Sequence, residues 1–405
     1  MHDAAEIDDG DLGAFRVRVA VWLEAHCPEQ MRTPARGEEQ MCWGGRRARF
    51  ASPAQRLWLQ RMAEQGWTVP EWAPQYGGAG LDKPRARVLR EEMHRLGCRV
   101  PLMSFGISML GPALLRFGSE AQKLEHLPRI ARGQIRWCQG YSEPGAGSDL
   151  ASLTTRAEDH GDYYLVNGQK IWTSYADQSD WIFCLVRTDP AADKHRGISF
   201  LLIDMASEGV STRPIRLISG KSPFCETFFE NVRVPKGDRV GAPGGGWDIA
   251  KFLLTHERES IGSMDLLPHD GTPVHELAIR DVGLEQGRLA DPILRAELAR
   301  WQVDSYAFEH TLARLREEAA GAQGLGALSS MLKYYGTELN KRKEDLALSI
   351  AGVSGLLWRE EAGGAPAHAD PARAWLRSKG NSIEGGTSEI QLNIIAKHLL
   401  RLPGA

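Results

Sequence analysis

The sequence predicts an α+β protein in which a β-rich central domain lies between two helical domains. Three observations predict this order. Residues 11–136 carry apolar residues at helical spacing, the following stretch is rich in aromatic and β-branched residues, and the helical pattern returns after residue 247. A run of helices, then strands, then helices is typical of an α+β arrangement. We place the three domains at residues 1–136, 137–245 and 246–405.

The N-terminal domain is expected to be helical because its charged stretches contain regularly spaced apolar residues. Residues 54–65, 85–96 and 119–131 all have this pattern. Gly66 follows the first of them and is a natural helix stop. The stretch 97–118 is punctuated by Gly and Pro, so it is predicted to be a connection between helices.

The central domain is expected to consist of strands. Asn167-Gly168 separates the two aromatic and β-branched segments 163–166 and 169–172, and Asn-Gly is favoured in tight hairpin turns, so these segments predict a β-hairpin. Further strands are predicted from composition at 181–186, 198–205 and 226–234. Beyond them the predicted helices are interrupted by loops at 268–273 and 361–371.

Composition excludes several classes of protein. The chain of 405 residues has a net charge of −3, which gives no indication of a nucleic-acid partner. It contains no apolar run long enough to span a membrane, and its acidic start resembles neither a secretory signal nor a transit peptide. The six cysteines are scattered without a Cys-x-x-Cys pair. We therefore expect a cytoplasmic protein with reduced cysteines, no zinc site and no membrane span.

The segment 141–149, Tyr-Ser-Glu-Pro-Gly-Ala-Gly-Ser-Asp, is the first candidate binding element. A loop so rich in glycine and small polar residues lets backbone amides approach a phosphate or a planar ring closely. Taken alone, the loop is explained more simply as a connection in which Ser148 or Asp149 caps a helix.

The second candidate element ends a predicted strand with an aromatic residue and two hydroxyls, Trp172, Thr173 and Ser174. A planar cofactor can lie against the indole and form a hydrogen bond with a neighbouring hydroxyl. The simpler alternative is a core tryptophan beside two solvent-facing hydroxyls.

Glu257 is the third candidate because it interrupts an apolar stripe. Ile249, Leu253 and Ile261 recur at intervals of four residues around it, so the carboxylate is predicted on the apolar face of a helix. A buried carboxylate has a raised pKa and is a stronger base than a solvated one. The alternative is an ion pair with a neighbouring arginine. A zinc site is excluded, because the helical partner of His256 is Ser260.

The fourth candidate element, residues 381–391, joins a loop to the apolar helix predicted at 390–402. Gly385 and Gly386 would let the chain pass close to a planar or anionic group near the helix start. Thr387 and Ser388 are candidate helix caps.

Together these elements, in this order, resemble the acyl-CoA dehydrogenase superfamily. The resemblance covers nearly the whole chain and also includes the segments 66–70, 76–78 and 226–235. It implies a helical N-terminal domain, a central β-barrel domain and a C-terminal four-helix bundle. It also implies that FAD lies between the last two domains and that an acyl-CoA thioester is the substrate.

The resemblance assigns roles by motif position. The residues implied to contact FAD are Gln139, Tyr141 and Ser142 in the glycine-rich loop, Trp172, Thr173 and Ser174 after the strand, and Thr387 and Glu389 near the C-terminus. Ser148 is implied to face the CoA arm, and Arg258 is placed on the substrate side.

The catalytic base differs between subgroups of this superfamily. Many members carry a glutamate at the position of Gly385, whereas a second subgroup places it directly before an arginine on the first helix after the β domain. Glu257-Arg258 matches the second arrangement, and the apolar stripe indicates the same residue. Glu384 is the alternative base. Gly385 retains a backbone amide, which the resemblance implies polarises the thioester carbonyl.

Two further family elements are altered. An Arg-x-Phe-Gly element is missing between residues 281 and 318, and a Gln-x-x-Gly-Gly-x-Gly element is replaced by residues 349–355. In the family these elements contact the FAD of a neighbouring subunit, so the resemblance implies an oligomer. Because a subgroup with similar losses forms mixed-subunit assemblies, the chain is expected to form either a homo-oligomer or a mixed-subunit oligomer.

The predicted reaction is dehydrogenation of an acyl-CoA to the trans-2-enoyl-CoA, with electrons passed to an electron-transfer flavoprotein. The alternatives are a non-catalytic partner subunit and an acyl-CoA oxidase-type relative.

Overall fold

The computed structural model describes residues 11–33, 35, 40–254, 272–319, 326–358 and 371–403, without the side chains of 316–319. The chain divides into two compact units. Unit 1 contains the described part of Met1–Cys138 together with Gln178–Trp181, and unit 2 contains the described remainder.

Unit 1 is helical, as predicted. Its α-helices are α1 (Leu12–His26), α2 (Pro53–Glu64), α3 (Lys83–Arg95), α4 (Gly111–Phe117) and α5 (Glu120–Ala131). The helix starts follow local chemistry. Ser52 Oγ accepts the Gln55 amide at the start of α2, and Ser119 and Gln122 form a capping box at the start of α5. The core of the unit buries Phe15, Val19, Leu23, Trp58, Met62 and Leu89.

The stretch 97–118 is not only a connection, so that prediction was wrong in part. It contains a π-helical turn, Gly106–Leu110, that continues into α4. Pro112 lies just beyond the π-helical turn in this continuous helical stretch, where its missing N–H forgoes one backbone hydrogen bond. Gly111 is there because a Cβ would lie 2.2 Å from Trp72. The residue types that predicted a loop are therefore accommodated at the junction between a π-helical turn and an α-helix.

A buried aromatic cluster joins α5 to the start of the strands. The rings of His126, Trp137 and Trp181 have centroids 5.1 to 5.4 Å apart. His126 is fully buried, and neither of its ring nitrogens has a hydrogen-bond partner among the described residues. Burial lowers the pKa of His126, because the charged imidazolium is poorly accommodated there.

Unit 2 begins with the predicted strands. They are β1 (Trp137–Gly140), β2 (Arg156–Asp159), β3 (Tyr163–Ser174), β4 (Trp181–Arg187), β5 (Ile198–Asp204), β6 (Val210–Ile215), β7 (Phe224–Pro235) and β8 (Arg239–Val240). They pair in the order β6-β7-β3-β2-β4-β5-β8, with β1 beside β4. The described strands thus form one sheet, whose end strands β6 and β8 are not paired to each other, so closure into the predicted barrel is not seen among them.

The hairpin predicted at Asn167-Gly168 is wrong, because β3 runs straight through both residues. Its pairing with β7 shifts register between Val166 and Gly168, which is the mark of a β-bulge. A Cβ on Gly168 would lie 2.6 Å from Thr155 Oγ1. The glycine therefore permits a close approach within the sheet instead of forming a turn.

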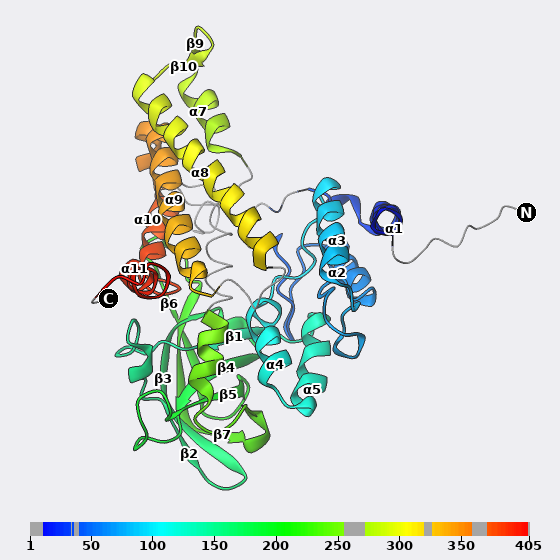
Figure 1. Cartoon of the computed structure of the whole chain (residues 1–405), viewed down its shortest axis with the longest axis vertical. Coiled ribbons are helices and arrows are strands. Elements are labelled where there is room, and N and C mark those ends of the chain that lie inside the picture. Colours follow the sequence, from blue (N-terminus) through cyan, green and yellow to red (C-terminus); the bar gives the residue numbers. More distant parts are fainter. Residues whose placement is uncertain are drawn as a thin grey trace, which may run out of the picture. The chain divides into compact units, whose positions relative to one another are not determined.

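The C-terminal part of unit 2 is helical. Its described α-helices are α7 (Val274–Val282), α8 (Pro292–Ala319), α9 (Leu328–Ala351), α10 (Pro371–Ser378) and α11 (Ser388–Ile394), and α8 and α9 lie side by side (Figure 1). A small hairpin, β9 (Leu284–Glu285) and β10 (Arg288–Leu289), interrupts them and was not predicted. Its turn is Gln286-Gly287, with both residues at positive φ, as a tight hairpin requires.

All six cysteines are free thiols. Among the described residues no cluster of potential metal ligands occurs, and none of their helices is long and apolar enough to cross a membrane.

The buried histidine makes the stability of unit 1 depend on pH. The folded pKa of His126 lies below its unfolded value of about 6.5. As the pH falls below that value, the unfolded chain gains a proton that the folded chain does not, so stability is lost by up to about 1.4 kcal/mol per pH unit. Wild-type protein should therefore lose more stability between pH 7 and pH 5 than His126→Leu.

The measurement is thermal unfolding followed by tryptophan fluorescence at both pH values. His94→Leu is the matched control, because His94 is exposed on α3 of the same unit. Equal losses in wild type and His126→Leu would contradict the assignment.

Candidate functional site

The glycine-rich loop is joined to β3 by its backbone. Gln139 lies in β1, and Tyr141, just beyond it, is buried. Ser142 accepts a hydrogen bond from the amide of Ile171 at 2.9 Å through its carbonyl oxygen. Lys170 also contacts Tyr141, although the two residues are 29 positions apart in the sequence. The start of the glycine-rich loop therefore runs beside the end of β3.

The rest of the loop forms a tight turn. Glu143 and Ala146 exchange two backbone hydrogen bonds of 2.9 and 3.0 Å. Ser148 is exposed beyond this turn, and Asp149 forms an ion pair of 2.5 Å with Lys194. The Asp149 side chain accepts no capping hydrogen bond from the short 3-10 turn that follows. The capping alternative raised by the sequence is therefore wrong for Asp149.

The end of β3 presents an aromatic ring to solvent. Trp172 is 52% exposed and has a φ of 60°, in the left-handed region that non-glycine residues seldom occupy. It lies where the ladder with β7 is irregular, between Lys170 and Thr173. The alternative of a core tryptophan is therefore wrong. A strained residue that exposes a large ring is typical of a binding site.

The two hydroxyls beside Trp172 differ. Thr173 is fully buried, and its Oγ1 has no hydrogen-bond partner among the described residues. Ser174 is partly buried. A buried hydroxyl without a partner costs about 1–3 kcal/mol, and Thr173 carries one next to the exposed Trp172 in the chain.

The C-terminal loop is held by a buried lysine. Lys333, on α9, is fully buried, and its Nζ donates to the carbonyl oxygens of Asn381 and Gly386 at 2.8 and 2.9 Å. Gln391 Nε2 donates to the carbonyl oxygen of Gly385 at 2.8 Å. Gly385 and Gly386 have φ values of 65° and 89°, so glycine is the residue that adopts this backbone without strain.

The start of α11 follows this loop. Thr387 is the helix cap, and its hydroxyl accepts the Ile390 amide at 3.3 Å. The side-chain oxygens Ser388 Oγ and Gln391 Oε1 are buried without a partner among the described residues. Glu389 is exposed, and hydrogen bonds from its own amide and from Thr387 lower its pKa. The loop therefore offers polar atoms that the described chain does not use.

Arg377 connects the C-terminal loop with the end of β3. Its guanidinium lies 5.6 Å from the centroid of the Phe224 ring, and that ring packs edge-on against Trp172 at 6.2 Å. The same guanidinium forms two hydrogen bonds, of 2.7 and 3.2 Å, with Glu384. The structure thus brings Trp172 and the Glu384–Gly385 loop to one region of unit 2.

Glu384 is fully engaged in this arrangement. Besides the two bonds from Arg377, its Oε1 accepts a hydrogen bond of 2.6 Å from Asn381 Nδ2. Both carboxylate oxygens of Glu384 are therefore occupied by donors of the described chain.

Glu257 and Arg258 lie outside the described residues. Residues 246–254 are helical, and Ile249 and Leu253, the part of the apolar stripe that the structure describes, are buried.

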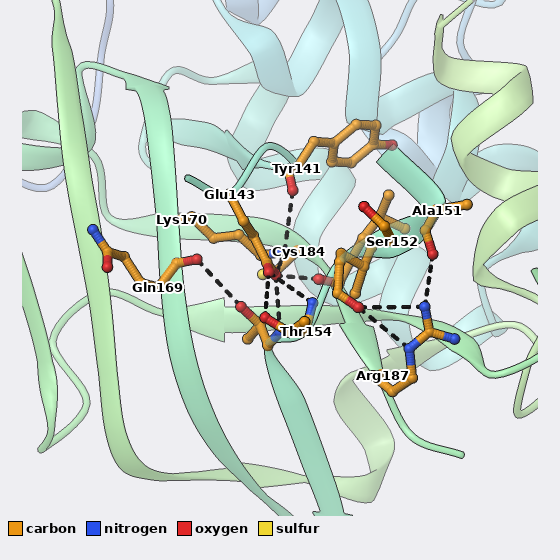
Figure 2. A network of polar contacts seen from close by, with 12 residues as sticks. Tyr141, Glu143, Ala151, Ser152, Thr154, Gln169, Lys170, Cys184 and Arg187 are labelled. Carbon is orange, nitrogen blue, oxygen red and sulfur yellow. Dashed lines mark hydrogen bonds and ion pairs between the residues drawn. The ribbon is translucent and has the colours of Figure 1, made fainter. Parts of the chain in front are cut away.

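Sequence reasoning missed four residues of this region: Glu143, Lys170, Phe224 and Arg377. Glu143 and Lys170 form a buried ion pair beneath the glycine-rich loop (Figure 2). Lys170 had a signal in the sequence, because it continues the inward alternation of Tyr164 and Val166 along β3. Phe224 and Arg377 had none, because their contact depends on the tertiary fold.

Comparison with known proteins decides the family. Three family models match successive parts of the chain: the acyl-CoA dehydrogenase N-terminal domain over residues 39–134, the middle domain over 138–232, and the C-terminal domain over 244–400. The acyl-CoA dehydrogenase IpdE1 of Mycobacterium tuberculosis is 35% identical over 97% of this chain and 98% of its own. The chain belongs to the acyl-CoA dehydrogenase family.

Solved structures agree with this assignment. A protein described as the Tcur3481-Tcur3483 steroid ACAD superposes with a TM-score of 0.75 at 30% identity, over 98% of this chain and 100% of that one. The ChsE4-ChsE5 complex from Mycobacterium tuberculosis superposes with a TM-score of 0.72 at 28% identity, over 97% and 98%. This acyl-CoA dehydrogenase is therefore an oxidoreductase of a family whose members are FAD-dependent flavoproteins.

The residues present fit a flavin. An exposed indole offers a surface for a planar ring, and the partly buried hydroxyl of Ser174 follows two residues later in the chain. At the start of α11, Ser388 Oγ and Gln391 Oε1 have no partner among the described residues and can bind a polar group.

The unpartnered hydroxyl of Thr173 can be tested through two quantities, the stability of the FAD-free protein and the affinity for FAD. Thr173→Val removes a buried oxygen without a partner, so the FAD-free protein should gain about 1 kcal/mol of stability. If FAD completes that hydroxyl, the same variant should bind FAD several-fold more weakly. Thermal unfolding without FAD and flavin-fluorescence titration measure the two effects.

Thr227→Val is the matched control. Thr227 lies in β7 of the same sheet, is fully buried and also has an unpartnered hydroxyl. It should gain stability with unchanged FAD affinity. If both variants bind FAD like the wild type, Thr173 plays no part in the site.

Proposed function

We propose that this enzyme removes the α-proton and the β-hydride of an acyl-CoA thioester, with FAD as hydride acceptor and Glu257 as base. The product is the trans-2-enoyl-CoA, and an electron-transfer flavoprotein takes the electrons. Family membership supports the reaction class. The choice of base rests on the geometry of the C-terminal loop.

The observation that carries the assignment is the engagement of Glu384. Its carboxylate is shared between Arg377 and Asn381, and the next residue, Gly385, has no side chain. A general base needs a carboxylate that can accept and release a proton at the substrate. Glu257, on the apolar stripe begun by the buried Ile249 and Leu253, is the remaining candidate.

The other residues have supporting roles in this proposal. The Gly385 amide polarises the thioester carbonyl, which acidifies the α-hydrogen, and Lys333 and Gln391 hold that loop in place. Ser148 contacts the CoA arm, and Arg258 binds the substrate. FAD, when bound against Trp172, supplies the redox chemistry, and the protein contributes orientation and exclusion of water.

Glu257→Gln should abolish α-proton abstraction while FAD binding is retained, because Gln keeps the shape of the side chain but cannot act as a base. Loss of a general base typically costs about 10²–10⁴-fold in rate. The measurement is single-turnover bleaching of the flavin by a panel of acyl-CoAs, which should include steroid acyl-CoAs in view of the relative described above.

Glu384→Gln is the matched variant. It weakens the contact with Arg377, so it should lower the rate less than Glu257→Gln does. The opposite ranking would assign the base to the C-terminal loop. Oxygen consumption with peroxide release would indicate an oxidase instead.

A second proposal concerns assembly. The segment that replaces the family's glycine-rich element ends in a 3-10 turn, Gly352–Leu356, where Val353 and Leu356 are 84% and 77% exposed. Leu357 and Trp358 continue this exposed apolar surface. Two solved relatives are described as pairs of different chains. We infer that this surface is covered by another subunit and that the second subunit, of the same or a different kind, completes the FAD site.

Leu356→Glu should reduce the assembled form and, with it, the retained yellow flavin, because a charge would be placed in the interface. Sedimentation velocity and the ratio of flavin to protein absorbance measure both. Val100→Glu is the control, since Val100 is 62% exposed in unit 1. A protein that stays colourless with every candidate partner would favour a non-catalytic subunit.

A further inference from the structure

A buried ion pair lies beneath the glycine-rich loop. Lys170 Nζ and Glu143 Oε1 are 2.8 Å apart, and the two side chains are 0% and 5% exposed (Figure 2). Charged side chains are seldom buried to this extent without a specific function, because each loses its hydration. Neither residue is assigned a role by the reaction proposed above.

The carboxylate of Glu143 is saturated with donors. Besides Lys170, Oε1 accepts the Thr155 amide at 2.9 Å, and Oε2 accepts the amide and hydroxyl of Thr154 at 2.7 and 2.9 Å. Burial alone would raise the pKa of Glu143, but the Lys170 cation and these hydrogen bonds lower it to about 2. The carboxylate is therefore ionised throughout the physiological pH range.

Lys170 reaches the loop at a second point. Its Nζ donates to the carbonyl oxygen of Tyr141 at 3.1 Å. The neighbouring Ile171 amide donates to the Ser142 carbonyl oxygen at 2.9 Å. Three consecutive loop residues, 141–143, are thus bonded to two consecutive residues of β3.

These bonds link the two β-domain segments assigned to FAD. Tyr141 and Ser142 lie on the loop, and Trp172 lies two residues beyond Lys170 on β3. The strand is irregular between Lys170 and Thr173, so regular pairing with β7 does not fix that stretch. The position of the loop against Trp172 therefore depends on the bonds made by residues 170 and 171.

We propose that Lys170 and Glu143 are a positioning pair that sets the spacing between the Tyr141–Ser142 and Trp172–Thr173 segments for FAD. A structural role alone explains the pair poorly, because apolar residues of similar size are often as stabilising as a buried ion pair. What the pair adds is a fixed geometry at a defined place. This inference rests on the proposed flavin site.

The test separates fold stability from positioning. Lys170→Met and Glu143→Gln each leave one buried partner unsatisfied, and both should lower the melting temperature. The double variant Glu143→Gln/Lys170→Met carries no buried charge, and Gln keeps one acceptor oxygen, for either Thr154 or Thr155, so it should recover part of the melting temperature lost by Lys170→Met.

The double variant should nevertheless bind FAD about tenfold or more weakly, with an altered visible circular dichroism of the flavin. In the FAD-free protein, amide hydrogen exchange over residues 141–149 should be faster than in the wild type. Asp159→Asn is the control, because it removes the exposed Asp159–Lys236 pair of the same sheet and should change neither readout.

Two results would overturn the proposal in distinguishable ways. A double variant with wild-type FAD affinity, flavin dichroism and loop exchange would show that the pair is only structural. Wild-type protein that takes up no FAD, even with a partner chain, would overturn the flavin site and this inference with it.

Discussion

Each of the two loops of the candidate site is held by a buried lysine whose Nζ atom donates hydrogen bonds to loop oxygens. Lys170 donates hydrogen bonds to the Glu143 carboxylate and the Tyr141 carbonyl oxygen of the glycine-rich loop. Lys333 donates hydrogen bonds to the carbonyl oxygens of Asn381 and Gly386 in the C-terminal loop. Each lysine lies on a regular element, a strand or a helix. Glycine-rich chain, which has high conformational entropy, is thereby fixed to rigid supports.

The link between the two loops is aromatic and cationic. Arg377 stacks near Phe224, which contacts Trp172, and pairs with Glu384 next to Gly385. In this arrangement Arg377 binds Glu384, the residue that the sequence offered as the alternative catalytic base. A planar guanidinium with five donors can bind both oxygens of a carboxylate and lie near a ring at once.

The order of domains could be predicted from sequence because helical and strand periodicities are local. The turn at Asn167-Gly168 could not, because the same dipeptide serves a hairpin or a bulge, and the close approach of Thr155 decides between them. Trp172 and Gly385 were assigned to the site from their motif positions, because a motif is read from residue spacing along the chain. The pairs Lys170–Glu143 and Arg377–Phe224 join residues distant in sequence, so only the fold could reveal them. The roles of all the assigned site residues, Glu257 and Arg258 included, remain predictions, as do the domain boundaries.

The pairing of β3 with β7 has a consequence for the order in which the site is built. Its strands are far apart in the chain, and such long-range ladders form late because loop closure must precede them. The capping box of α5 and the helices of unit 1 are local and need no such step. Phe224 is the first residue of β7, so Arg377 can contact the Phe224 ring only after the β3–β7 ladder has formed. We expect that the nascent chain acquires helices first and that the cofactor meets a polypeptide whose synthesis is complete.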